Sequence, residues 1–121
     1  GDLSITAGPM VLSSGSYRAS KLYISGSGKL IADTLNGPVT LYVDGRVYVS
    51  GQGVELTDPA PEKFALYITD DTYDVQVKSS AEFTGVIYAP TAEVEIQDDA
   101  VFFGAVVADE VDVEDDAVFL Y

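Results

Sequence analysis

The strongest constraint on the fold of this chain is a phrase of eleven residues that occurs three times toward its C-terminus. The phrase reads VQVKSSAEFTG from Val75, VEIQDDAVFFG from Val94 and VDVEDDAVFLY from Val111. The offsets are 19 and 17 residues, and within each copy apolar residues alternate with polar ones. A period this short is typical of a solenoid in which each repeat forms one coil stacked on the last.

Weaker copies of the phrase extend the repeat toward the N-terminus. The equivalent positions, at spacings of 19, 25, 28, 19 and 17 residues, are Leu3, Leu22, Val47, Val75, Val94 and Val111. Three short strands and three corners use about this many residues. The repeat therefore predicts an all-β fold, a single-stranded parallel β-helix of about six coils of 17–28 residues. The usual rule for parallel crossovers favours a right-handed coil, and a left-handed triangular helix, which also uses periods near 18 residues, is the alternative. No segment keeps a helical period, so no helices are predicted.

Composition narrows the classes of partner and chemistry. A single domain over residues 1–121 is expected, because the chain is too short for two. Six Lys and Arg against twenty Asp and Glu give a formal charge of −14, which argues against nucleic acid and anionic membranes as partners. Cysteine and histidine are absent, which excludes disulfides, thiol chemistry and most zinc sites. No apolar run is long enough for direct membrane insertion.

A second ladder of strand residues precedes the later copies of the phrase. Because side chains alternate along a strand, Tyr42, Tyr67 and Tyr88 are expected to form a row on an outer face. One interpretation is surface stacking of the three rings, and the other is a binding platform for a glycan or a surface protein. The insert Thr57–Glu62 contains two prolines, so we expect it to project as a loop.

The C-terminal part of the chain is strongly acidic, because no Lys or Arg follows Lys78. In stacked coils the acidic residues form vertical pairs: Glu93 with Glu110, Glu95 with Asp112, Asp98 with Asp115, and Asp99 with Asp116. Two full charges one strand spacing apart repel by roughly 0.9 kcal/mol in water. One interpretation is a solvated face screened by salt.

The other interpretation is a bound cation. Ca²⁺ would bridge oxygens of successive coils at the corners formed by Asp98, Asp99, Asp115 and Asp116. Beyond this possible Ca²⁺, no cofactor is expected. The acid pairs come from the repeat itself and no Arg or Lys accompanies them, so we expect no catalytic residues and no enzyme activity.

Core-type residues stand at both ends of the chain. These residues are Leu3, Ile5, Phe119, Leu120 and Tyr121. The last coil of a solenoid exposes unpaired backbone and an apolar cross-section unless something caps it. Head-to-tail stacking would make the chain a homo-oligomer, and such a contact gives a filament if it does not close. Caps supplied by flanking residues are the alternative.

Three segments carry a resemblance to a known family. They are LSSGSY (12–17), GPVTLYVDGRVYVSGQG (37–53) and the run from Phe83 to Tyr121, in which GVIYAP is the most specific piece. They resemble the C-terminal β-helical domain of bacterial pilus-assembly (PilX-type) and related cell-surface proteins, and more distantly the bactofilin β-solenoids. The resemblance implies an extracellular or cell-surface location and a structural or adhesive role, with no catalytic residues to carry over. Asp98-Asp99 and Asp115-Asp116 depart from the Ser-Gly-Asn turn of that family.

These features together predict a non-enzymatic structural or adhesive module of the bacterial cell surface, which stacks end to end into a filament or pilus-like assembly. The alternative is a monomeric surface domain that binds a glycan, a protein or Ca²⁺.

Overall fold

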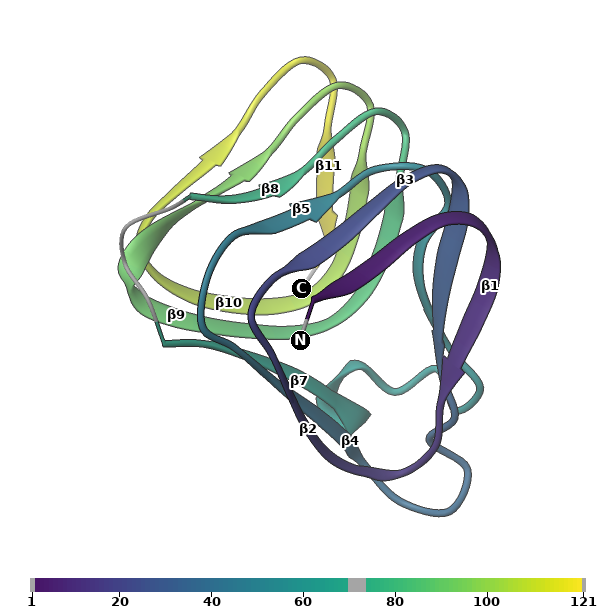
Figure 1. Ribbon diagram of the computed structural model, residues 1–121. Helices are drawn as coiled ribbons and strands as arrows, with labels where there is room; N and C mark the ends of the chain where they lie inside the picture. The colour runs from purple at the N-terminus through teal and green to yellow at the C-terminus, as the bar shows by residue number, and fades with distance from the viewer. Residues whose placement is uncertain (1, 70–73, 121) are drawn as a thin grey trace.

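The chain folds into a parallel β-solenoid of about six coils (Figure 1). The computed structural model describes residues 2–69 and 74–120. The strands are β1 (Leu3–Leu12), β2 (Gly15–Ala19), β3 (Leu22–Ala32), β4 (Val39–Val43), β5 (Val47–Val49), β6 (Gly53–Leu56), β7 (Phe64–Ile68), β8 (Val75–Val77), β9 (Glu82–Ile96), β10 (Val101–Val113) and β11 (Val118–Leu120). The strand pairings among these residues are all parallel, as predicted.

Three ladders of strands form the three sides of the solenoid. The first ladder joins β1, β3, β5, β8, β9 and β10. The second joins the later parts of β1 and β3 to β6, β9, β10 and β11. The third joins β2, β4, β7, β9 and β10. The long strands β9 and β10 bend around the corners and contribute to all three sides (Figure 1).

The register confirms the repeat read from the sequence. The six expected equivalent positions follow one another in the first ladder: Leu3, Leu22, Val47, Val75, Val94 and Val111. In the third ladder Leu41, Leu66 and Ile87 are also in register, and all three are buried. The insertions that vary the spacing therefore lie in the corners and leave the strand pairing intact.

The core is a set of stacked layers, because each coil contributes the same kind of residue at the same position. Phe64, Phe83 and Phe102 are among the largest fully buried side chains. The rings of Phe83 and Phe102 stack with centroids 5.0 Å apart, and Phe119 continues the stack at 5.1 Å. The Phe102 ring is thus covered on both faces, by Phe83 of the coil before it and by Phe119 of the coil after it.

Glycines make the corner beside this stack possible. Gly85 and Gly104 have φ angles of +151° and +145°, and a Cβ on Gly104 would collide with the carbonyl oxygen of Gly85. Only glycine allows the two backbones to approach this closely here.

The proline-containing insert was expected to project as a loop, but part of it packs against the solenoid. Its residues Pro61–Lys63 form a turn of 3-10 helix, in which the Lys63 N–H donates to the Ala60 oxygen at 3.0 Å. This turn packs against β9 and β10, and Pro61 lies near Gly104. The space left by glycine at that corner is thus partly filled by the insert. The structure contains no α-helix in the described residues.

We predict that Phe83→Ala lowers the free energy of unfolding by about 3–5 kcal/mol, because it leaves a cavity between the rings of Phe64 and Phe102. Chemical denaturation followed by circular dichroism measures this change. Leu35→Ala is the control, since Leu35 is 68% exposed, and it should shift stability by no more than about 0.5 kcal/mol. Equal losses for the two variants would contradict the layered core.

Candidate functional site

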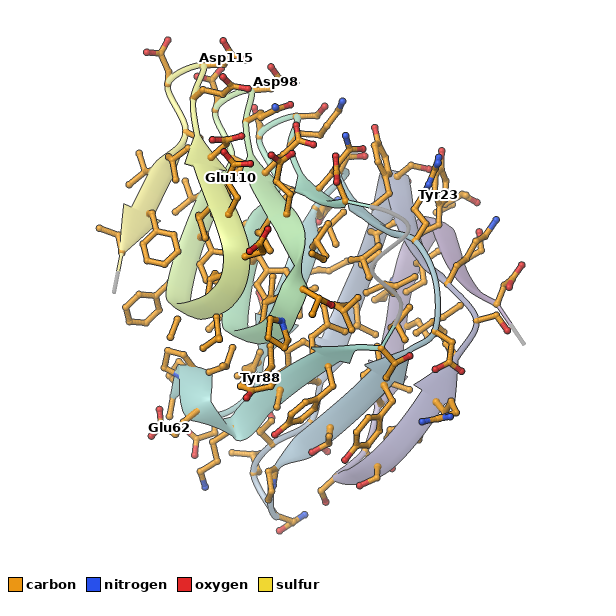
Figure 2. The ribbon with its side chains drawn as sticks, turned by 90° about the vertical axis from the view of Figure 1, so that its left-hand side faces the viewer. Tyr23, Glu62, Tyr88, Asp98, Glu110 and Asp115 are labelled. Carbon is orange, nitrogen blue, oxygen red and sulfur yellow. The ribbon has the colours of Figure 1, made fainter. Side chains whose placement is uncertain are left out.

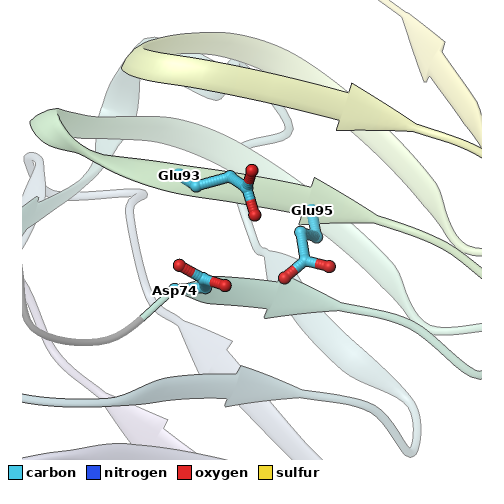
Figure 3. A group of neighbouring side chains, drawn as sticks. All are labelled: Asp74, Glu93 and Glu95. Carbon is cyan, nitrogen blue, oxygen red and sulfur yellow. The ribbon is translucent and has the colours of Figure 1, made fainter.

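Five acidic residues of the last three coils gather on the first side of the solenoid. Glu93 pairs in register with Glu110, and Glu95 with Asp112, as the sequence predicted. Asp74, just before β8, joins them from the preceding coil, and Figure 3 shows its carboxylate directed toward those of Glu93 and Glu95. We call Asp74, Glu93, Glu95, Glu110 and Asp112 the acidic cluster.

Carboxylate oxygens in this cluster are close enough to share a cation. They form two overlapping groups, Asp74 with Glu93 and Glu95, and Glu93 with Glu110 and Asp112. Within each group one oxygen from each residue lies within 4.8 Å of the others. Hard cations such as Ca²⁺ prefer oxygen ligands of this type. The cluster is therefore a second possible place for a cation, in addition to the predicted corners.

The crowding changes the acidity of two carboxyl groups. A hydrogen bond with Glu110, partial burial and the nearby charge of Asp74 raise the pKa of Glu93 to about 7. Burial and a hydrogen bond with Asp74 raise the pKa of Glu95. The Gln97 side-chain amide donates to Glu95 at 2.8 Å and to Glu114 at 2.6 Å. One neutral amide thus bridges two carboxylates of successive coils by donating a hydrogen bond to each.

The corner aspartates have a clear backbone role. Asp98 and Asp99 have φ angles of +57° and +66°, and Asp115 and Asp116 have +56° and +63°. The Ala100 N–H donates to the Gln97 oxygen at 3.1 Å, so each pair occupies the centre of a type I′ turn. Aspartate adopts this left-handed conformation more readily than most residues.

These turns also stack on one another. The Asp99 N–H donates to the Asp115 oxygen at 3.0 Å, and the Ser80 N–H donates to the Asp98 oxygen at 2.9 Å. All four aspartates are exposed, and Figure 2 shows Asp98 and Asp115 side by side at one edge of the molecule. Neither group of three carboxylates described above includes a corner aspartate. Ca²⁺ at the corners remains a prediction.

The expected tyrosine row is present on the third side. The rings of Tyr42 and Tyr67 stack at 5.1 Å with 19° between their planes, and Tyr67 and Tyr88 follow at 5.5 Å and 50°. The first two rings turn their faces toward each other, so a partner would meet mainly hydroxyl groups and ring edges. Tyr88 is the most accessible, at 44% exposed.

A second tyrosine pair on the first side was not predicted. Tyr23 and Tyr48 stack at 5.1 Å, and the Lys21 and Lys78 amines lie 5.8 and 5.7 Å from their ring centroids. The signal was present, because Leu22-Tyr23-Ile24 and Val47-Tyr48-Val49 share one pattern. The first side is thus aromatic and basic in the early coils and acidic in the late ones.

The predicted self-assembly residues do not all lie in the cross-section of the end coils. Ile5 is buried, whereas Leu3 and Phe119 are half-buried at opposite ends. Leu120 is 50% exposed and, by strand alternation with Phe119, points away from the core. Tyr121 lies outside the described residues. Val111 and Val113, which were not singled out for this role, expose 41% and 44% at the C-terminal coil.

Comparison with known proteins gives one match. The model of a domain of unknown function (DUF7305) matches residues 21–121. The chain belongs to the DUF7305 family. The matched residues include every strand from β3 to β11 and all of the acidic cluster. No curated protein and no solved structure matches the chain. The described residues of this DUF7305 protein include no helix able to span a membrane.

The raised pKa of Glu93 predicts how stability depends on pH. The folded protein holds this proton more tightly than the unfolded chain does, so the stabilisation from protonation is lost as pH rises from the ordinary value of 4.5 through about 7. Glu93→Gln should therefore raise the unfolding temperature at pH 8 and change it much less at pH 5. Glu62→Gln, on the exposed insert, is the control and should have little effect at either pH. A gain from Glu93→Gln that is as large at pH 5 as at pH 8 would argue against charge crowding.

Corner substitutions separate the backbone role from cation binding. Asp98→Val should destabilise the fold by about 1–2 kcal/mol, because a β-branched residue is strained at positive φ, whereas Asp98→Gly should cost little.

Differential scanning calorimetry with and without millimolar Ca²⁺ tests whether a cation binds at the corners. If Ca²⁺ binds at the corners, it raises the unfolding temperature of the wild type, and Asp98→Asn with Asp115→Asn abolishes that rise. If the rise persists in this double variant but disappears in Glu93→Gln, the acidic cluster is the site.

Proposed function

We propose that this DUF7305 chain is a non-enzymatic structural or adhesive module of the bacterial cell surface that self-associates by head-to-tail stacking of coils. The observation that carries the proposal is the apolar surface that β10 exposes in the last coil of the described residues. Val111 and Val113 expose 41% and 44% of their surface, whereas Val94 and Ile96, their partners one coil earlier, are fully buried. A further coil packed on β10 and β11 would bury these valines and pair with the backbone of both strands.

In the proposed contact the N-terminal coil of a second copy continues the ladders in register. Leu3–Ile5 of that copy would lie on Val111–Val113, and its Pro9–Val11 on Val118–Leu120, by extension of the register within one chain. Met10, which is 39% exposed, would then continue the column of Phe102 and Phe119. Apolar area removed from water in this way contributes roughly 25 cal/mol per Å².

The distribution of charge favours a head-to-tail contact. Residues 1–60 contain four Lys or Arg and five Asp or Glu, whereas residues 61–121 contain two and fifteen. Joining two C-terminal ends would bring two acidic halves together. Joining the C-terminal end to the N-terminal end places the acidic half beside a nearly neutral one, so the repulsion is smaller.

The cell-surface location and the structural or adhesive role are supported by the resemblance to the β-helical domains of pilus-assembly proteins. A regular solenoid without histidine or cysteine agrees with a structural role. The second candidate is a monomeric surface domain that binds a glycan, a protein or Ca²⁺. The exposed Tyr88 at the end of the tyrosine row, together with the acidic cluster, favours that candidate.

We predict that Val113→Asp abolishes head-to-tail association. It places a charge on the apolar surface of the last coil, where a second copy would have to desolvate it. Val107→Asp is the matched control, because Val107 lies in the same strand and is 45% exposed, but belongs to the outer column that follows Tyr88. Sedimentation velocity should show wild type and Val107→Asp forming species larger than a dimer, and Val113→Asp not forming them. A wild type that never exceeds a dimer would refute the proposal.

A substitution at Pro9 should have the opposite effect. Pro9 occupies the position of Val101 and Val118, whose N–H groups donate to Ala81 and Ala100 of the preceding coil at 2.9 Å. Proline has no N–H, so one hydrogen bond is missing from the head-to-tail contact. Pro9→Val restores the donor and should tighten association by about 1 kcal/mol, roughly fivefold. Weaker association of Pro9→Val in the same sedimentation assay would contradict the proposed register.

A further inference from the structure

The second side of the solenoid has an outer surface that is unusually apolar at both ends. Its central column, one residue from each coil, is Val11, Ile31, Glu55, Thr84, Phe103 and Leu120. The neighbouring column is Pro9, Lys29, Gly53, Glu82, Val101 and Val118. We call the two columns together the lateral face.

Several of these apolar side chains face the solvent. Val11 is 58% exposed, Phe103 41%, Val118 44% and Leu120 50%. Outward positions in a strand usually carry polar residues, but in β10 they are apolar. Residues 101–108 read VFFGAVVA, without a polar residue. Strands with such continuous apolar runs are usually covered on both faces, and exposed apolar patches of this kind mark interaction sites.

The order of residues along the lateral face is self-complementary. The column reads apolar, apolar, polar, polar, apolar, apolar from the first coil to the last. A two-fold axis parallel to the strands, between the third and fourth coils, would turn a second copy so that its last coil faces the first coil of its partner. Val11 then meets Leu120, and Ile31 meets Phe103. Glu55 and Thr84, which both line a groove of about 250 Å³, lie near the axis.

From this pattern we infer that two copies of the chain pair side by side through the lateral face, with their solenoid axes antiparallel. A two-fold contact of this type is isologous, so the same residues act on both copies. It goes beyond the head-to-tail contact, which uses the ends of the coils and leaves this face open.

Charge supports the antiparallel arrangement over a parallel one. The nearly neutral half of one copy, residues 1–60, lies against the acidic half of the other. Lys29, in the second coil, would lie opposite Val101 of the second copy and close to Glu82 of that copy, one coil before Val101. Its own ion pair with Glu55, at 2.8 Å, holds it on this face. A parallel pair would bring the two acidic halves together instead.

Cysteine cross-linking tests the arrangement directly, because the chain has no cysteine. Ile31 and Phe103 lie three coils apart, about 14 Å, within one chain and also between two copies stacked head to tail. That separation is too long for a disulfide. The variant Ile31→Cys with Phe103→Cys should therefore form a covalent dimer on oxidation only if the copies pair side by side, and the single variant Ile31→Cys separates the antiparallel from the parallel arrangement. Ile31→Cys alone should not cross-link, and would do so if the pair were parallel.

A charge swap in solution provides the second measurement. The variants are made in the Val113→Asp background, which blocks head-to-tail stacking, and circular dichroism verifies that each is folded. In sedimentation velocity this background protein should form a dimer. Phe103→Glu and Ile31→Lys should each weaken the dimer by about tenfold or more, and the combination Ile31→Lys with Phe103→Glu should restore it. A background protein that stays monomeric, or a double cysteine variant that gives no covalent dimer, would overturn the inference while leaving the head-to-tail proposal untouched.

Discussion

Each coil of this solenoid can bury its apolar residues only against the coil before it and the coil after it. Ile96 is fully buried because coils lie on both sides, whereas Val113, in the same position one coil later, is 44% exposed. Stability is therefore a sum of contacts between neighbouring coils, as expected for repeat proteins. The parallel register must be kept from the first coil to the last, because a shift by one residue would turn every core side chain outward.

The same register brings like residues together at every position, and the energetic result depends on the residue type. Phenylalanine above phenylalanine gives a stacked core, and Tyr23 above Tyr48 gives a surface pair with its rings 5.1 Å apart. Glutamate above glutamate brings two carboxyl groups together, and the hydrogen bond between Glu93 and Glu110 raises the pKa of Glu93. One geometrical rule thus explains both the aromatic rows and the acidic cluster.

The coil equivalences and the inward and outward positions could be predicted, because a period-2 pattern repeated six times determines both. The sequence predicted the vertical pair of Glu93 and Glu110 for the same reason. Asp74 was not listed with them, although it precedes Val75 as Glu93 precedes Val94 and Glu110 precedes Val111, so the repeat itself held the signal. The left-handed turns at Asp98 and Asp115 were interpreted as possible ligand positions, because a sequence shows carboxylates but not backbone angles. The packing of Pro61 against the Gly104 corner likewise depends on contacts between distant residues.

The proposed contacts use two apolar surfaces of the described residues: the valines that β10 exposes in the last coil, and the lateral face. The central claim is that one more coil can always be added in register. Negative-stain electron microscopy of the purified protein, at increasing salt, tests it most directly, because salt screens the acidic cluster without altering the apolar ends. The account predicts thin filaments of uniform width that lengthen as salt increases. Isolated particles at every salt concentration would contradict it.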